Sequence, residues 1–182
     1  MNTVLFSPDE MMQTIQPEHN AVTKQFVLAG KAIFTVELDS AFAAERGHKA
    51  HYTYKVIRKA AKGKYPEKWF ASYLTGPDNT KSYSYIGVLE AEPGEVRLTE
   101  KSKVNEKSFV YLLLNRTLKL IWNDDITPML DKGFKLHHEG RCCRCGRTLT
   151  VPLSITTGIG PECYKHMTGN SYPHISVEGT LE

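Results

Sequence analysis

Hydrophobic and polar positions alternate with a period of two over much of the first half of the chain. In residues 51–57, aromatic and aliphatic side chains alternate with polar ones, which is the pattern of a half-buried β-strand. Four other runs share this aromatic and β-branched character: residues 26–38, broken by Gly30, then 69–74, 83–90 and 96–99. The connections between these runs are short and carry turn residues, which favours an antiparallel meander.

The period changes to that of a helix over residues 108–122. The apolar side of this helix is supplied by Phe109, Leu112, Leu113 and Leu120, and its polar stripe by Asn115, Arg116 and Lys119. Because one face of the sheet has to be buried, we expect this helix to cover it. The predicted fold class is therefore α+β, an antiparallel β-sheet covered by one helix.

All four cysteines lie near the end of the chain, between residues 142 and 163. In a reducing compartment, such clustering favours a metal site over disulfides. The spacing is C-x2-C-x17-C-x2-H, formed by Cys142, Cys145, Cys163 and His166. Two closely spaced pairs of such ligands suit a tetrahedral zinc ion. Gly146 suits the tight turn of the first pair, and Pro161 suits the start of a helix that presents the second.

We therefore expect one structural Zn2+ in this segment, held by four protein ligands. The identity of the fourth ligand stays open. His137 or His138 could take the place of His166, because both precede the first cysteine pair. Cys143 lies inside the turn and is expected to be a thiol that does not bind the metal. A closed site with four protein ligands leaves no position for a substrate, so we do not expect catalysis at this zinc.

These patterns divide the chain into five parts. The expected division is a polar, acidic arm at 1–25, a β-rich core domain ending in the helix at 26–122, a polar connector at 123–140, a zinc finger at 141–168 and a flexible tail at 169–182. A short helix is expected inside the arm at 8–15. We also expect the core to have its own apolar set, so that it would stay folded if the finger unfolded.

Charge is unevenly distributed along a chain whose formal net charge is +3. Residues 1–20 contain acidic side chains and no lysine or arginine, whereas residues 55–68 contain six basic side chains and one acidic one. The candidates for contact with nucleic acid are Lys55, Arg58, Lys59, Lys62 and Lys64 in this segment, and Arg141, Arg144 and Arg147 beside the cysteines. An ordinary solvated turn explains the basic segment equally well, and both interpretations stay open.

Aromatic side chains are frequent in the predicted strands. Those considered are Tyr52, Tyr54, Trp69, Tyr73, Tyr83 and Tyr85. If some of them lie on the sheet face away from the helix, they could stack on unpaired bases. The alternative is that they fill the hydrophobic core, where large aromatic side chains usually lie. The pattern favours the core.

The cysteine-rich segment also resembles a known group of proteins. Residues 141–150, then Pro152, Ser154, 158–161 and Cys163, resemble a short zinc-finger domain found in many uncharacterised bacteriophage and prophage proteins. The similarity continues thinly upstream, at 34–35, 69–70, 74–79, 83–87, 98–99 and 101–102. The resemblance implies a C-terminal treble-clef-like zinc finger and a mobile-element source. It implies no established activity, and the fourth metal ligand varies among such domains.

The leading functional hypothesis is a phage-type zinc-finger protein that binds nucleic acid without strong sequence specificity. The main alternative is a phage factor that binds and inhibits a host defence or replication protein. A metal-dependent nuclease is the weakest candidate. Some nucleases place a catalytic histidine on the hairpin of a treble clef, and residues 148–157 contain none. The sequence therefore favours a binding protein over an enzyme.

The expected location is the cytoplasm, or the host-cell cytoplasm if the protein is phage-encoded. No apolar run approaches the roughly 20 residues needed to span a bilayer, and the N-terminus lacks the features of a secretory signal. We expect no membrane partner. The sequence does not indicate an oligomeric state.

Overall fold

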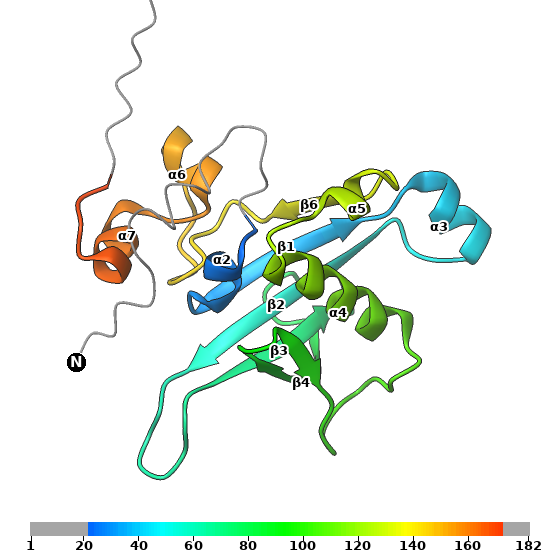
Figure 1. The fold of residues 1–182 in the computed structure, drawn as a ribbon, viewed down its shortest axis with the longest axis horizontal. Coiled ribbons are helices and arrows are strands. Elements are labelled where there is room, and N and C mark those ends of the chain that lie inside the picture. The colour runs from blue at the N-terminus through cyan, green and yellow to red at the C-terminus, as the bar shows by residue number, and fades with distance from the viewer. Residues whose placement is uncertain (1–21, 173–182) are drawn as a thin grey trace, which may run out of the picture.

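The structure is a computed structural model, and it describes residues 22–172. Its centre is one six-stranded antiparallel sheet with strand order β5-β4-β3-β2-β1-β6 (Figure 1). The strands are β1 (Lys31–Glu37), β2 (His51–Lys59), β3 (Lys68–Leu74), β4 (Tyr83–Glu90), β5 (Glu95–Arg97) and β6 (Lys135–His138). The α+β class with an antiparallel sheet, predicted from the alternating pattern, is confirmed.

The first predicted strand is wrong in its N-terminal part. Residues 24–28 form a short helix, α2 (Lys24–Leu28), and only the residues after Gly30 form β1. The Thr23 side chain caps this helix by accepting a hydrogen bond from the amide of Phe26, at 3.2 Å. The boundary between α2 and β1 could not be predicted, because a short buried helix and a buried strand both appear in the sequence as a continuous apolar run.

Helix α4 (Phe109–Trp122) covers one face of the sheet, as expected. Its buried residues follow helical spacing and are Val110, Leu113, Leu114, Thr117, Leu118 and Ile121. The predicted apolar side was wrong at Leu112, which is 51% exposed. Residues 109–114 are apolar almost all around the helix, so their pattern did not show which side faces the sheet.

Polar contacts fix α4 against the sheet. The hydroxyl group of Tyr54, a fully buried residue of β2, donates to the carbonyl of Val110 at 2.9 Å. Asn115 accepts from the amide of Val96 at 2.7 Å and donates to its carbonyl at 3.3 Å. The short strand β5 therefore pairs with β4 and also with a helix side chain, which satisfies backbone groups that would otherwise be unpaired.

The stretch 123–140 was expected to be a polar connector, but it adds a strand to the sheet. It contains α5 (Thr127–Leu130) and β6, which pairs with β1 from Phe34 opposite His138 to Glu37 opposite Lys135. Leu136 is buried on the same face as the core residues of β1. Another unexpected helix, α3 (Ser40–Arg46), joins β1 to β2.

The arm at 1–25 and the tail at 169–182 lie mostly outside the described residues, and so does the helix expected at 8–15. The described residues of these segments take part in the fold, as Thr23 and Lys24 do in α2. Val22 is buried, and Tyr172 packs edge-on against Tyr164 at a ring distance of 5.1 Å. Within residues 22–172, every helix falls short of the length or apolar character that a bilayer crossing requires.

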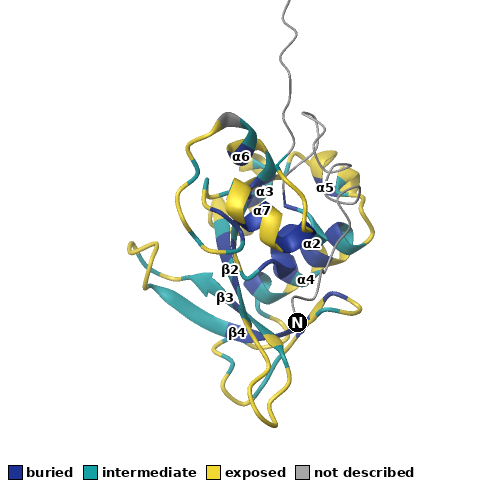
Figure 2. Cartoon of the chain, turned by 90° about the vertical axis from the view of Figure 1, so that its left-hand side faces the viewer, coloured by how far each residue is buried: buried dark blue, intermediate teal, exposed yellow. Residues whose placement is uncertain are grey.

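The two faces of the sheet differ in what covers them. The helices α2 and α4 and the cysteine-rich end of the chain lie together on one side of β2, β3 and β4 (Figure 2). The buried side chains of β1 point to that side, while Ile33, Thr35 and Glu37 lie on the other. We call this second side the open face, and most of its residues are intermediate in burial or exposed.

Candidate metal centre

Residues 142–147 form a tight turn that carries the first two cysteines. The amide of Cys142 donates to the carbonyl of Arg147 at 2.8 Å, and the amide of Gly146 donates to the carbonyl of Cys142 at 2.8 Å. Gly146 has a φ of +79°, a conformation that favours glycine. These bonds fold the chain back on itself, so that one turn carries both Cys142, which is buried, and Cys145, which is exposed.

The third cysteine is presented by helix α7 (Pro161–Thr168). Pro161 begins the helix, as predicted, and Cys163 is buried in its first turn. The sulfur atoms of Cys142, Cys145 and Cys163 all lie within 4.8 Å of one another. Three thiols at such distances fit the ligand set of a thiophilic metal ion, so the sequence-predicted cluster is present and suggests a metal site.

Burial and hydrogen bonding shift the pKa values of two of the three thiols in opposite directions. Burial raises the pKa of Cys163 to about 11, although a hydrogen bond from the Arg144 guanidinium to its sulfur, at 3.7 Å, acts in the opposite direction. Burial also acts to raise the pKa of Cys145, but hydrogen bonds from the Arg147 backbone and the neighbouring thiols outweigh it, and the pKa is lowered. A bound dication would stabilise all three thiolates.

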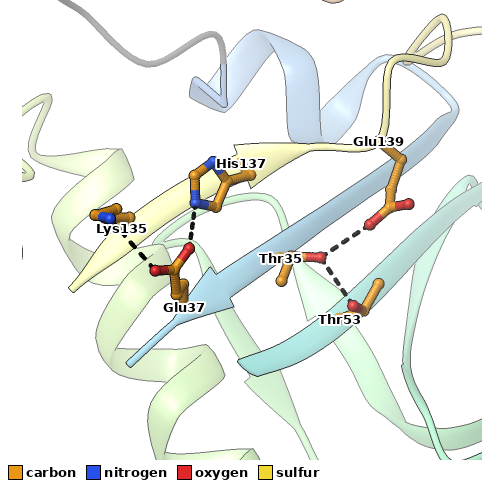
Figure 3. Close-up of polar contacts among 6 residues, drawn as sticks. All are labelled: Thr35, Glu37, Thr53, Lys135, His137 and Glu139. Carbon is orange, nitrogen blue, oxygen red and sulfur yellow. Dashed lines mark hydrogen bonds and ion pairs between the residues drawn. The ribbon is translucent and has the colours of Figure 1, made fainter. Parts of the chain in front are cut away.

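The fourth predicted ligand, His166, is not in this group of mutually close side chains among residues 22–172. His166 lies on α7 three residues after Cys163 and is exposed. The two alternative histidines are engaged elsewhere. His137 is 2.9 Å from the Glu37 carboxylate (Figure 3), and His138 accepts from the amide of Gly140 at 3.0 Å. The identity of the fourth ligand therefore stays a prediction.

Cys143 connects the cysteine turn to the sheet through its backbone. Its carbonyl accepts from the amide of Lys31 in β1 at 2.6 Å, and its amide donates to the carbonyl of Gly158 at 2.9 Å. Its side chain is almost completely buried, and this burial raises the pKa of the thiol well above its ordinary value. Gly30 permits the close approach, because a Cβ atom at this position would lie 2.9 Å from the carbonyl oxygen of Arg144.

The arginines beside the cysteines are less available than the sequence indicated. Arg144, a candidate for contact with nucleic acid, is half-buried and turned toward the sulfur of Cys163. Arg141 is exposed and donates to the carbonyl of Gly146 at 3.3 Å. Arg147 is exposed. In the basic segment, the guanidinium of Arg58 is 2.6 Å from the carboxylate of Glu67.

The lysines of the basic segment lie on the hairpin that joins β2 to β3. Lys62 and Tyr65 exchange two backbone hydrogen bonds of 3.0 Å across the two-residue turn, where Gly63 has a φ of +58°. Lys68, the last residue of the basic segment, pairs directly with Lys59 across the hairpin, and sequence reasoning missed Phe70 on the same strand. Period-two alternation would have placed both on one face, but the cross-strand partner depends on the register.

The treble-clef arrangement is not confirmed. Such a fold would place a β-hairpin after the cysteine turn, in the span 148–157. The described chain there has one isolated bridge, between Arg141 and Thr148, followed by helix α6 (Pro152–Thr157). The turn and α7 do resemble the two halves of a zinc-finger-like domain, with α6 between them.

One protein family matches part of this chain. Residues 137–168 match a family described as "Family of unknown function (DUF6011)". The matched segment begins within β6, includes all three clustered cysteines and ends with α7. It therefore coincides with a short C-terminal cysteine-rich domain. Comparisons with curated proteins and with solved structures gave no significant match.

Proposed function

We propose that this protein is a zinc-stabilised protein that binds nucleic acid without strong sequence specificity. The observation that carries the proposal is the basic hairpin, which we define as residues 59–68. Lys59 and Lys68 lie directly opposite each other on β2 and β3, and Lys62 and Lys64 lie at the turn. Like charges in directly opposed positions destabilise a hairpin, and a bound polyanion would remove this repulsion.

The basic hairpin has little neutralising charge of its own. Its one acidic residue, Glu67, is engaged by Arg58. Within residues 22–172, none of the four lysines forms an ion pair with a carboxylate. Figure 1 supports an accessible position, because the connection between β2 and β3 extends away from the rest of the fold. We leave Arg58 out of the proposed contact surface and retain the lysines.

We propose Zn2+ as the metal, held by Cys142, Cys145, Cys163 and His166. Thiolate and imidazole are the ligands that structural zinc prefers, and a closed set of four gives the ion a structural role. His166 is supported by its place one helical turn from Cys163 on α7. Bound zinc would join the cysteine turn to α7 and so stabilise the attachment of both to the sheet.

Fluorescence anisotropy with labelled DNA tests the nucleic-acid proposal. We expect binding to weaken as salt rises, because the contacts are made to phosphates. Replacing Lys62 with alanine should reduce the slope of log K against log salt by about 1. Lys119→Ala is a matched control, because Lys119 is an exposed lysine on α4, far along the chain from the hairpin. Equal effects of the two substitutions would contradict the proposed contact surface.

A pull-down from a bacterial lysate, with and without nuclease, distinguishes this function from the host-protein alternative. We expect the captured material to be nucleic acid and to disappear after nuclease treatment. A single bacterial protein that stays bound after nuclease treatment would overturn the proposal. A bacteriophage or prophage source is implied by the family resemblance, a cytoplasmic location is expected from the sequence, and both stay predictions.

A further inference from the structure

The register of the sheet decides which side chains share the open face beside the basic hairpin. Lys55 of β2 lies opposite Ser72 of β3, and Ser72 lies opposite Tyr85 of β4. The alternation along each strand places further residues on the same face. We refer to Lys55, Lys59, Lys68, Phe70, Tyr83 and Tyr85 as the basic aromatic face.

The aromatic side chains of the strands divide between the two faces. Tyr54 is fully buried on the helix side, and Tyr52, Trp69 and Tyr73 pack against the core there. Tyr83 and Tyr85 lie on the open face, together with Phe70, and all three are intermediate in burial. The core therefore accounts for four of the six aromatic positions considered from the sequence and leaves the other two for a different role.

Two lysines lie against the aromatic rings of this face. The ammonium group of Lys55 is 3.6 Å from the ring centroid of Tyr83, and that of Lys59 is 5.3 Å from the ring centroid of Phe70. The rings of Phe70 and Tyr85 are themselves neighbours, with centroids 6.4 Å apart. Flat apolar rings and cations thus alternate across adjacent strands. A ligand that fits both would combine flat groups with negative charge.

Positive and negative side chains occupy different parts of the open face. Within the described residues, Lys55, Lys59 and Lys68 form no ion pair. The carboxylates of Glu37 and Glu139 lie at the β1–β6 edge, where Glu37 binds Lys135 and His137, and Glu139 accepts from Thr35 at 2.9 Å (Figure 3). The basic side is therefore complementary to an anion. The acidic edge begins close to Tyr83, because burial and then the Glu139 carboxylate raise the pKa of this phenol, so a bound strand would end near Tyr83.

We propose that the basic aromatic face binds single-stranded nucleic acid, with bases stacked on Phe70 and Tyr83 and phosphates held by Lys55, Lys59 and Lys68. Unpaired bases present the flat faces that these rings can stack on, whereas a duplex hides them. The inference rests on the proposed nucleic-acid function and specifies its substrate class. Tyr65 is 68% exposed at the tip of the basic hairpin, and the ammonium group of Lys64 lies over its ring. This pair repeats the combination of ring and lysine beyond the ends of β2 and β3.

The test uses the full chain and three fluorescent probes of equal length. These are an oligothymidylate of about 16 nucleotides, its duplex with oligoadenylate, and an abasic strand that keeps the phosphates and lacks the bases. We expect the intact single strand to bind at least about tenfold more tightly than the abasic strand, because stacking supplies much of the affinity. We also expect it to bind more tightly than the duplex.

Two variants locate the stacking on the protein. Tyr83→Leu should weaken binding of the single strand roughly tenfold and leave binding of the abasic strand unchanged. Tyr83→Phe keeps the ring and should retain the affinity, and a thermal melt of each variant shows whether it has folded. Phe70→Leu repeats the test at the second ring.

The outcomes separate this inference from the proposed function. Equal affinity for intact and abasic strands, or unchanged binding by both leucine variants, would overturn the stacking inference and leave polyanion binding in place. Failure to bind any of the three probes at low salt would overturn both.

Discussion

The attachment of the cysteine-rich segment to the sheet can be tested by replacing Ile159 with alanine. Ile159 lies between α6 and α7 and has no exposed surface. It belongs to a single cluster of buried residues that also includes Phe26 and Phe34 in the N-terminal half of the fold. Truncating a fully buried isoleucine to alanine costs about 2–5 kcal/mol of unfolding free energy.

The size of the expected change in melting temperature follows from this cost. For a chain of this length, 1 kcal/mol corresponds to about 2–4 °C, so a loss of about 3 kcal/mol lowers Tm by roughly 6–12 °C. Ile155→Ala is the matched control, because Ile155 is on the neighbouring helix α6 and 43% exposed. Exposed substitutions usually change stability by less than about 0.5 kcal/mol.

Tryptophan fluorescence shows which part of the molecule responds. Both tryptophans of the chain lie outside the cysteine-rich segment: the Trp69 indole donates to the carbonyl of Leu28 at 2.9 Å, and that of Trp122 donates to the carbonyl of Ala91 at 2.7 Å. We expect Ile159→Ala to lower the tryptophan-detected midpoint, because segment and sheet share one core. An unchanged tryptophan midpoint, with earlier release of metal to a coloured chelator, would refute this reasoning. It would support the independently folding finger expected from the sequence.

Three further predictions concern the backbone, pH and the metal. Gly30→Ala should lower the unfolding free energy measured by urea denaturation by about 1–3 kcal/mol because of the positive φ at this position, and further because the new Cβ would contact the Arg144 carbonyl. Gly47→Ala is the control, since Gly47 also has a positive φ but open space around it, and it should lower the unfolding free energy less. Hydrogen bonds from His137 and Lys135 lower the pKa of Glu37 below its ordinary value of 4.5. Its carboxylate therefore stabilises the fold above pH 4.5, and the stability difference between Glu37→Gln and the original chain should close as the pH falls through the lowered pKa. Cys145→Ser should abolish the zinc found by elemental analysis in the original chain, and equal zinc in both would exclude this thiol as a ligand.

Much of the local structure could be predicted from the sequence. The strand predicted at 83–90 and the helix predicted at 108–122 agree with β4 and α4 to within a residue at each end. The strand is rich in aromatic and β-branched residues, and the helix is long enough for its type to be recognised even though its first two turns did not show which side is buried. The three clustered cysteines were also predictable, because their spacing reflects the turn of 142–147 and the first turn of α7.

The sequence could not reveal the roles that depend on distant partners. The short strand β6 has little pattern of its own, and it is a strand because β1 offers it a hydrogen-bonding edge about a hundred residues upstream. Arg58 and Arg144 carry the same charge as their neighbours, but one is engaged by Glu67 and the other by Cys163. Sequence composition counts such charges as available, and only the fold shows which are already paired.

The amino-acid sequence by itself determined the periods, the turns and the cysteine spacing, because these depend on residues close together along the chain. The tertiary structure decided which sheet face is covered, which tyrosines remain on the open face, and that the cysteine-rich segment shares the core of the sheet. These properties follow from strand register and from packing between segments far apart in sequence. A one-residue change of register would exchange the two faces without changing the local pattern.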